Sequence, residues 1–446
     1  MNSHRQTKRA LLTSVMALVM CVVMLLGTTF AWFTDTAKTN VNTIKAGNLN
    51  VTLEKQEADD SWVPAENETL TWKTYDNRAQ DQIFWEPGCT YDLQPVRVKN
   101  DGNLALKYKI EITGIKGSDK LNEVITWTIN DTDLSADHYL AAGKTSTALT
   151  IKGHMDENAG NEYKNLTIEN IAITVVATQD AVEYDSSKNT YDENATYPVV
   201  AKNQAEVNNA ITNTTEKNVT IAVPAGQTTT LDNDIANESN NNGKSRNVTF
   251  IGDGSQTVDV VTNAITAEGG ELNYQRGSSF TFENLTIQAG VGNFDGIVCD
   301  ELTYKDCTIK GKLTLFGKAT FINCVFDNTM ANQYSIWTWG GTDVTFEGCT
   351  FNTNGKAILL YGGAAASNPT NLVVNNCTFN DRNNGTAGKA AIEIGNDYNA
   401  TYTLTVNNAT VSGFAAGKNT GSTLWANKNS MDAAHLTVTI DGVKVQ

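Results

Sequence analysis

From Asn247 onward the chain repeats one short sequence pattern. An apolar residue is followed by two polar or small residues, a small apolar residue, Thr or Val, and a second apolar residue. The small apolar position is occupied by Leu285, Cys307, Cys324, Cys349, Cys377, Ala409 and Val443. A constant strand pattern at unequal intervals is typical of a right-handed parallel β-helix, in which each coil adds a strand and the turns absorb differences in length.

Four of the seven cysteines fall in this repeated position, namely Cys307, Cys324, Cys349 and Cys377. We interpret them as an internal ladder of small hydrophobic side chains. Disulfide pairing and metal binding are the alternatives. Zinc-ligand spacing is absent, because no CxxC pair occurs and His435 is far along the chain.

A second set of segments suggests a second column. The segments Thr314–Gly317, Trp337–Gly340 and Leu359–Gly362 align with Ile392–Gly395 and Thr423–Ala426. This alignment gives one shared position to Phe316, Trp339, Tyr361, Ile394 and Trp425. The column is either a buried stack of large apolar side chains or an exposed aromatic stripe that stacks on sugar rings. Alternation alone does not decide which face is buried.

The first part of the chain predicts antiparallel strands. Segments such as Leu49–Leu53, Leu106–Ile110 and Ile171–Val175 alternate apolar and polar residues, with turn residues between the strands. We therefore expect an all-β protein, with an N-terminal jelly-roll-like β-sandwich and a C-terminal right-handed parallel β-helix. The expected divisions are a signal peptide at 1–31, the sandwich at 32–180, a linker at 181–204 and the β-helix at 205–446.

The N-terminus resembles a secretory signal. Lys8 and Arg9 precede an apolar run over 10–27, and small residues stand at Thr29 and Ala31. We expect cleavage after Ala31, which gives a mature chain that begins at Trp32 and lies outside the cytoplasmic membrane. An uncleaved membrane anchor is the alternative, since the run is close to the length of a span.

Several motifs in the first part of the chain resemble the TasA/camelysin family of Gram-positive bacteria. They are Gly27-Thr-Thr-Phe-Ala-Trp-Phe-Thr-Asp35, Ala46-Gly-Asn-Leu-Asn-Val-Thr-Leu53, Glu86-Pro-Gly88 and the segment 98–106, with closing strands over 163–179. The resemblance covers about residues 7–180. It implies a signal peptidase of the SipW type as a partner, a jelly-roll-like domain, and a place at the cell surface or in the biofilm matrix.

Subunits of the TasA type form fibres, so the resemblance also implies assembly with copies of this chain or with other matrix subunits. The donor segment would be about 32–53, with Leu49, Val51 and Leu53 as the donor strand. An extended segment of this kind satisfies the unpaired backbone groups of an open sheet edge.

Composition and the remaining residues weigh against several other functions. The net charge of −16 argues against nucleic-acid binding. The chain has no HExxH motif, and His138 and His154 are expected in solvated loops, which disfavours a camelysin-type metallopeptidase. We predict no metal and no cofactor. The acidic residues that a carbohydrate-active enzyme would need occupy different repeat positions, and these candidates are Asp295, Asp300, Asp306, Asp327, Asp343, Asp381, Glu393 and Asp397.

The sequence thus favours a secreted structural or adhesive protein, without catalytic residues, whose β-helix presents a long face to carbohydrate or to neighbouring subunits. The alternative is a carbohydrate-active enzyme of the β-helix type, either a polysaccharide lyase or a hydrolase. A fold alone does not supply an activity.

Overall fold

The computed structural model describes residues 49–446 except 66–67, 69, 74–78, 81–82, 114–115, 118, 135, 167, 170–171, 181–196, 202, 213–215, 224–227, 232–245, 261–277, 291–295, 298, 332, 363–368 and 396–399. The signal peptide and its cleavage residues Thr29, Ala31 and Trp32 lie outside these residues. Within them, no helix is long and apolar enough to cross a membrane.

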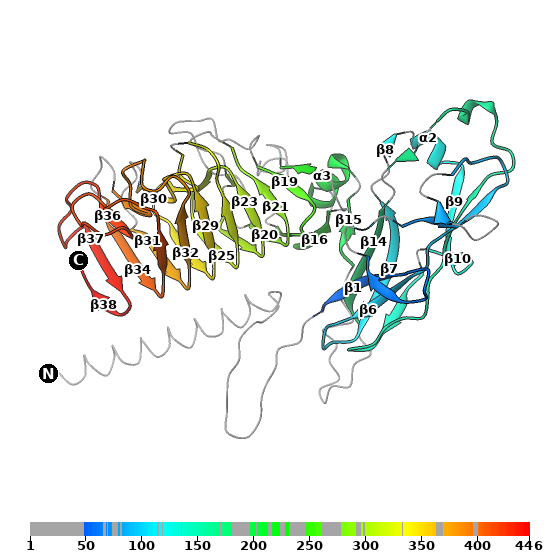
Figure 1. Cartoon of the computed structure of the whole chain (residues 1–446), viewed down its shortest axis with the longest axis horizontal. Coiled ribbons are helices and arrows are strands. Elements are labelled where there is room, and N and C mark those ends of the chain that lie inside the picture. The colour runs from blue at the N-terminus through cyan, green and yellow to red at the C-terminus, as the bar shows by residue number, and fades with distance from the viewer. Residues whose placement is uncertain are drawn as a thin grey trace, which may run out of the picture.

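The first domain is built from antiparallel strands around one main hydrophobic core, as the alternating sequence predicts (Figure 1). Its elements are β1 (Val51–Gln56), β2 (Trp62–Pro64), β3 (Trp72–Lys73), β4 (Ala79–Gln80), β5 (Thr90–Leu93), β6 (Val96–Asn100), β7 (Leu106–Thr113), β8 (Lys116–Gly117), α2 (Asp119–Asn122), β9 (Ile125–Ile129), β10 (Thr132–Asp133), β11 (His138–Leu140), β12 (Ile151–Met155), β13 (Ile168–Glu169) and β14 (Ala172–Gln179). Aliphatic residues such as Val98 and Ile110 are fully buried in this core.

Strand β1, which contains the predicted donor residues, is paired on both sides within its own chain. Val51 faces Asn100 and Leu53 faces Val98 on β6, while the end of β1 pairs with β2. Leu49 packs against the same core. In this arrangement β1 itself completes the sheet, and the rest of the predicted donor segment, 32–48, lies outside the described residues. Donor-strand assembly stays a prediction.

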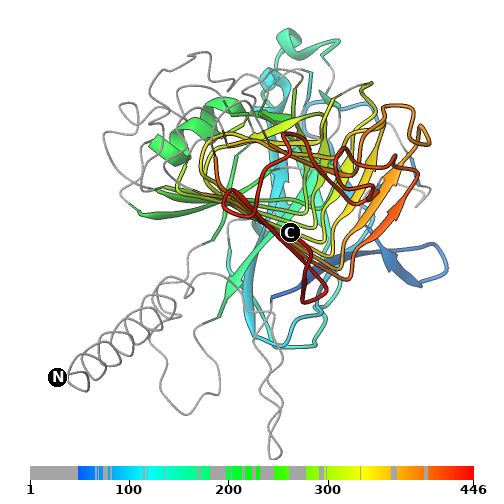
Figure 2. The ribbon, with the colours of Figure 1, turned by 90° about the vertical axis from the view of Figure 1, so that its left-hand side faces the viewer.

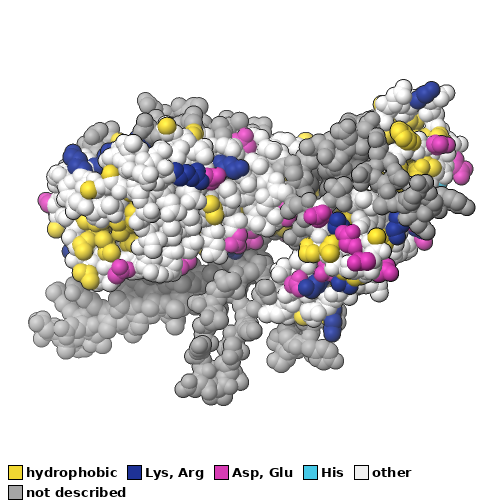
Figure 3. Space-filling view, in the orientation of Figure 1, with side chains coloured by type: hydrophobic (Ala, Val, Ile, Leu, Met, Phe, Trp, Pro, Cys, Tyr) yellow, Lys and Arg dark blue, Asp and Glu magenta, His cyan; other side chains and the backbone are white. Residues whose placement is uncertain are grey.

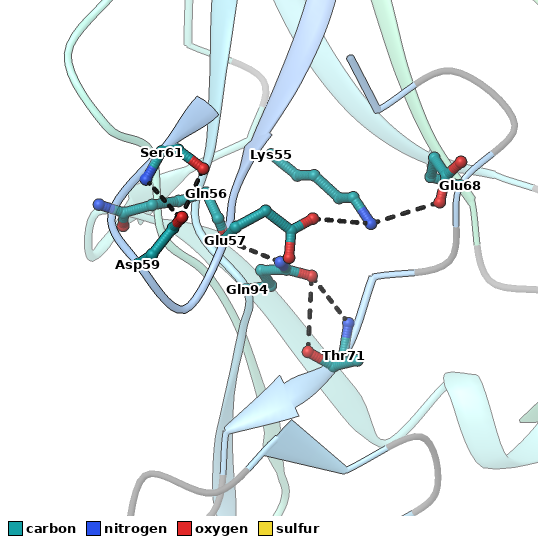
Figure 4. A network of polar contacts seen from close by, with 8 residues as sticks. All are labelled: Lys55, Gln56, Glu57, Asp59, Ser61, Glu68, Thr71 and Gln94. Carbon is teal, nitrogen blue, oxygen red and sulfur yellow. Dashed lines mark hydrogen bonds and ion pairs between the residues drawn. The ribbon is translucent and has the colours of Figure 1, made fainter. Parts of the chain in front are cut away.

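Polar contacts hold the carboxyl-terminal end of β1 (Figure 4). Lys55 Nζ lies 3.2 Å from a Glu57 carboxylate oxygen and 3.4 Å from one of Glu68. The Gln94 side-chain amide donates to the Gln56 carbonyl, and its own oxygen accepts from the Thr71 backbone N–H. These contacts fix the β1–β2 hairpin to the neighbouring segments.

The two histidines of this domain lie on strands, so the expectation that both are in loops is wrong. His138 is in β11 and stacks on Tyr108 with ring centroids 5.1 Å apart. His154 is in β12, where its Nδ1 lies 2.8 Å from Thr90 Oγ1. Each imidazole is therefore engaged with a neighbour on the adjacent strand.

The end of the predicted linker joins the two domains. The Tyr197 hydroxyl donates to Asp137 Oδ1 at 3.1 Å, and the Lys109 ammonium lies 4.8 Å from the Tyr197 ring centroid. Val200 packs with Val176 of the sandwich and with Ala222 of the second domain. Because β15 (Val199–Val200) already pairs in parallel with the next strand, the second domain begins inside the segment expected as linker.

The second domain is a parallel β-helix of three sheets (Figure 2). The long sheet runs through β15, β16 (Asn218–Ala222), β18 (Asn247–Ile251), β20 (Ser279–Glu283), β22 (Glu301–Lys305), β25 (Lys318–Ile322), β28 (Asp343–Glu347), β31 (Thr370–Asn375), β34 (Tyr402–Asn407) and β37 (Leu436–Ile440), and closes with antiparallel β38 (Val443–Lys444). Helix α3 (Gln204–Thr212) lies at its start.

The other two sheets are shorter. The second sheet contains β17 (Thr228–Thr230), β19 (Thr257–Asp259), β21 (Thr286–Gln288), β23 (Thr308–Lys310), β26 (Val325–Asp327), β29 (Thr350–Thr353), β32 (Thr378–Asp381) and β35 (Thr410–Ser412). The third sheet contains β24 (Leu313–Leu315), β27 (Ile336–Thr338), β30 (Ile358–Leu360), β33 (Ile392–Ile394) and β36 (Trp425–Asn427).

In-register pairing stacks like side chains inside the β-helix. In the long sheet, Tyr304 and Phe321 stack with ring centroids 4.7 Å apart, and Phe321 and Phe346 at 4.8 Å. In the second sheet, Phe326 stacks on Phe351 at 4.2 Å. Each buried ring contributes on the order of 2 kcal/mol through removal of apolar area from water.

The corner between the long sheet and the second sheet is a two-residue turn from β20 onward. Its first residue adopts a left-handed conformation, which Asn, Asp and Gly tolerate best, as at Asn323 (φ 52°) and Gly348 (φ 65°). Its second residue is the small apolar repeat position. Cys307, Cys324, Cys349 and Cys377 therefore occupy successive corners, where each is at most 1% exposed.

The four corner thiols are free and point into the interior. Cys324 Sγ donates to the Tyr304 carbonyl at 3.4 Å. The neighbouring thiols of Cys307 and Cys349, together with burial, raise the pKa of Cys324. These cysteines act as small buried side chains in the turn.

We expect Phe326→Ala to lower the free energy of unfolding by about 3 kcal/mol or more, because it removes a fully buried ring that stacks on Phe351 and leaves a cavity. Val325→Ala is the matched control on the same strand. The Val325 side chain points outward and is 38% exposed, so its truncation should cost well under half as much. Denaturant unfolding of both variants measures the difference, and equal losses would contradict the predicted stack.

The corner thiols should resist alkylation in the folded protein, because only a thiolate reacts and these thiols are buried. Peptide mass spectrometry after iodoacetamide treatment should find Cys307, Cys324, Cys349 and Cys377 unmodified until denaturant is added. All four should then react without a reductant. A requirement for reductant would show disulfides and contradict the ladder.

Candidate functional site

The outer face of the third sheet differs from the outer faces of the other two. In the long sheet the central outward column is half-buried and consists almost entirely of threonine: Thr220, Thr249, Thr281, Thr303, Thr320, Thr345, Val373, Thr405 and Thr439. Threonine is a common residue of half-exposed strands. The corresponding column of the third sheet is Thr314, Trp337, Leu359, Glu393 and Ala426.

These third-sheet residues point outward but are largely covered. Thr314 and Ala426 are fully buried, and Glu393 is 1% exposed, while Trp337 remains half-buried. Connecting segments such as 382–391 and 428–435 precede or follow these strands in the sequence. The third sheet is therefore the floor of a covered surface, which we call the third-sheet site.

A second column borders this floor at the carboxyl ends of the strands. It consists of Phe316, Trp339, Tyr361, Gly395 and Lys428, each the residue after its strand. Backbone hydrogen bonds fix the register, since Trp339 N–H donates to the Leu315 carbonyl and Lys428 N–H to the Ile394 carbonyl. Its three aromatic residues are half-buried.

The predicted aromatic column is thus correct for Phe316, Trp339 and Tyr361 and wrong for Ile394 and Trp425. Ile394 pairs with Leu360 and Asn427, and Trp425 pairs with Ile392, so both side chains lie in the core. A glycine follows each aromatic residue of the column and also follows Ile394. Because Gly395 itself occupies the column, that glycine gave the wrong register.

The aromatic residues of the third-sheet site contact one another. Trp339 and Tyr361 stack with ring centroids 5.4 Å apart, and Trp337 meets Tyr361 edge to face at 5.7 Å. Lys312, which is 1% exposed, places its ammonium 4.8 Å from the Trp337 ring centroid.

Charged groups gather beside the rings. Lys389 Nζ lies 3.3 Å from Glu393 Oε2, and the Glu393 side chain is 2% exposed. Lys356 Nζ lies 5.3 Å from the ring centroid of Tyr334. Burial and the Glu393 carboxylate raise the pKa of Tyr334.

The remaining acidic candidates among the described residues have other surroundings. Arg382 pairs with Asp327 at 2.6 Å on the second sheet. The buried Asp381 carboxylate accepts the backbone N–H groups of Asn383 and Gly385, which is a turn-forming role. Asp300, Asp306 and Asp343 are exposed, and Asp295 and Asp397 lie outside the described residues. Among the described residues no group of three His, Cys, Asp or Glu side chains could hold a metal ion.

Sequence reasoning missed the basic residues of the third-sheet site. Lys312, Lys356 and Lys389 each stand shortly before a short apolar strand of the third sheet. A lysine that repeatedly stands shortly before a three-residue strand with apolar ends is visible in the sequence, but its role depends on which face of the strand is buried.

No protein-family model matches the chain, and no curated protein matches it. The similar solved structures include the Agl-KA catalytic domain, which is 12% identical with a TM-score of 0.20 over 80% of this chain and 90% of that one. They also include the catalytic domain of GH87 α-1,3-glucanase in complex with nigerose (12% identical, TM-score 0.19, 88% of this chain and 98% of that one).

A third is the catalytic unit of thermostable GH87 α-1,3-glucanase from Streptomyces thermodiastaticus strain HF3-3, which is 13% identical with a TM-score of 0.21 over 89% of this chain and 96% of that one. These neighbours are catalytic domains, so the expectation that the chain is not an enzyme does not stand. At such TM-scores the likeness supports no assignment of substrate or catalytic residue. The TasA/camelysin resemblance remains a prediction.

The Lys389–Glu393 pair predicts an asymmetry in stability. Lys389→Met leaves the buried Glu393 carboxylate without its nearest cation and should cost about 3 kcal/mol. Glu393→Gln removes the buried charge and leaves the half-buried Lys389 able to reach water, so it should cost about 1 kcal/mol or less. Denaturant unfolding of the two variants tests this order, and a larger loss for Glu393→Gln would contradict it.

Proposed function

We propose that this chain is an exported protein that acts on polysaccharide, with the glycan held along the third-sheet site. The observation that carries the proposal is the outer face of the third sheet. There Trp337 stands in the column that corresponds to the threonines of the long sheet, and Trp339 and Tyr361 stand in the next column, directly after their strands. Aromatic residues combine a large apolar contact area with a polar edge, which suits the mixed surface of a sugar.

The site continues over several coils, so a linear chain of sugars could follow the axis of the β-helix. The five strands of the third sheet lie side by side at the spacing of parallel strands, about 4.8 Å. Successive coils would then contact successive parts of the glycan, and the polar groups beside the rings would fix its orientation. This arrangement supports the recognition of a polymer over that of a single small sugar.

Catalysis at the third-sheet site has less structural support than glycan binding. Glu393 is a buried carboxylate, and carboxyl groups are common proton donors and acceptors in enzyme sites. Among the described residues no second carboxylate approaches Glu393 in the way that paired-carboxylate hydrolysis requires. Binding is therefore the part of the proposal to test first.

The test is binding of the chain from Trp32 onward to α-1,3-glucan, cellulose, chitin, xylan, alginate and polygalacturonate, with release of reducing ends measured in the same samples. We expect at least one polysaccharide to bind, and Trp339→Ala to weaken that binding about tenfold or more. Tyr139→Ala is the control, because Tyr139 is 61% exposed on the sandwich domain. Binding to none of the six, or equal losses in the two variants, would overturn the proposal.

A further inference from the structure

The outer face of the long sheet is regular over most of the β-helix. Successive strands from β16 to β37 pair in parallel and in register, so their outward side chains form three straight columns along the axis. The central column holds threonine in every strand except β31, where it holds Val373. In Figure 3 most of the visible surface over the β-helix is neither charged nor hydrophobic. The face is therefore an even, largely uncharged surface that repeats with every coil.

The hydroxyl groups of the central column are available to a partner. Within the described part of the chain none of them makes a hydrogen bond, whereas the Thr410 hydroxyl of the second sheet donates to that of Thr378 at 3.1 Å. A hydroxyl group both donates and accepts hydrogen bonds. Two identical rows of hydroxyl groups can therefore satisfy each other, which two rows of carboxylates or of ammonium groups cannot do.

Charged side chains of the two flanking columns have partners on the face itself or at its corner. Two ion pairs, each with a nitrogen–oxygen distance of 2.7 Å, join neighbouring coils: Lys305 with Glu283 and Lys318 with Glu301. The Asp343 carboxylate accepts an amide N–H of Asn371 at 2.6 Å. The Glu347 carboxylate accepts one of Asn376 at 2.7 Å. These contacts lower the cost of covering the face, because charged groups that lose water need other partners.

The face is large enough for a specific interface between two proteins. Eight strands spaced about 4.8 Å apart, each with five residues that rise about 3.3 Å, cover roughly 600 Å². Two such faces would bury roughly 1,200 Å² in total, which is the lower limit of the standard size class. A second copy of this chain carries columns with the same spacing, so each row of one face meets a row of the other. This match favours a copy of the chain as the occupant of the face.

We propose that two copies of this chain pack with their long sheets face to face around a two-fold axis. An axis parallel to the strands, between β25 and β28, places Thr320 opposite Thr345 of the other copy. The same axis places Lys318 opposite Asp343 of the other copy. This register covers the strands from β18 to β37 and sets no two like charges opposite each other. The third-sheet site lies on a different sheet, so this inference is independent of the proposed function.

The first test is sedimentation equilibrium of the chain from Trp32 onward, over a wide range of protein concentration. We expect a monomer–dimer equilibrium with a dissociation constant of about 10 μM, because modest interfaces are commonly of micromolar affinity. A chain that stays monomeric up to about 100 μM, tenfold above that constant, would overturn the proposal. Growth beyond the dimer would overturn it as well, because two-fold pairing closes at two copies.

The double variant Thr320→Lys/Thr345→Lys brings four ammonium groups together at the centre of the interface. It should raise the dissociation constant about tenfold or more, because like charges across an interface repel each other. The matched control is Thr308→Lys/Thr350→Lys, which adds the same charge to half-buried outward positions of the second sheet. It should leave the dissociation constant unchanged, and thermal unfolding checks that both variants are folded. A dimer that survives in the first variant, or weakens equally in both, contradicts the proposed face.

A charge exchange tests the register at exposed positions. Lys318 and Asp343 are both exposed, so changing them leaves the core intact, and this test decides the matter if Thr320→Lys/Thr345→Lys does not fold. Lys318→Asp sets two carboxylates opposite each other and should weaken the dimer. Lys318→Asp/Asp343→Lys restores opposite charges and should return the dissociation constant to within about threefold of the original value. If the second substitution restores nothing, the proposal is wrong.

Discussion

In-register parallel pairing of successive coils is the constraint on which the second domain depends. Each strand lies directly on its predecessor, so every position of the repeat becomes a column along the axis. Columns of identical residues are favourable for rings such as Phe321 and Phe346, which stack, and for asparagines, whose side chains bond to one another, as Asn408 does to Asn376 at 2.9 Å. A column of like charges would repel itself, and the left-handed corner position from β20 to β34 accordingly holds Asn or Gly in every coil except one, where it is Asp306.

The same constraint determines where the coils can differ. The corner between the long sheet and the second sheet is fixed at two residues from β20 onward, because a left-handed residue and a small buried residue are both needed there. Insertions must therefore enter at the other two corners. Both of those corners border the third sheet. The fixed two-residue corner thus accounts for both the unequal intervals of the repeat and the covered outer face of the third sheet.

The fixed corner also explains which parts of the fold could be predicted from the sequence. The repeated position of Cys324 and Cys349 was visible because its corner has constant length, and the β-helix followed from it. The third-sheet column could be aligned where the glycine comes one position after the residue that follows the strand, as at Phe316 and Trp339. At β33 the glycine is itself the residue that follows the strand, so the same glycine rule placed Ile394 in the wrong column. The contact between Lys389 and Glu393 depends on how such a segment folds back, which residue spacing does not encode.

The buried charged residues on the outer face of the third sheet cost stability, and this cost is an argument that the face binds a ligand. A threonine column would satisfy a half-exposed strand, as it does on the long sheet, without burying any charge. Burial of the Glu393 carboxylate needs Lys389 as a partner, and such a pair gains little or nothing in stability over well-packed apolar residues. Burial of the Lys312 ammonium beside Trp337 likewise gains little or nothing in stability over well-packed apolar residues. Residues that break the pattern of their own repeat and add no stability are expected where a protein meets its ligand. In this chain they converge on one face, which is why we place the glycan there and not on the smoother surfaces of the other two sheets.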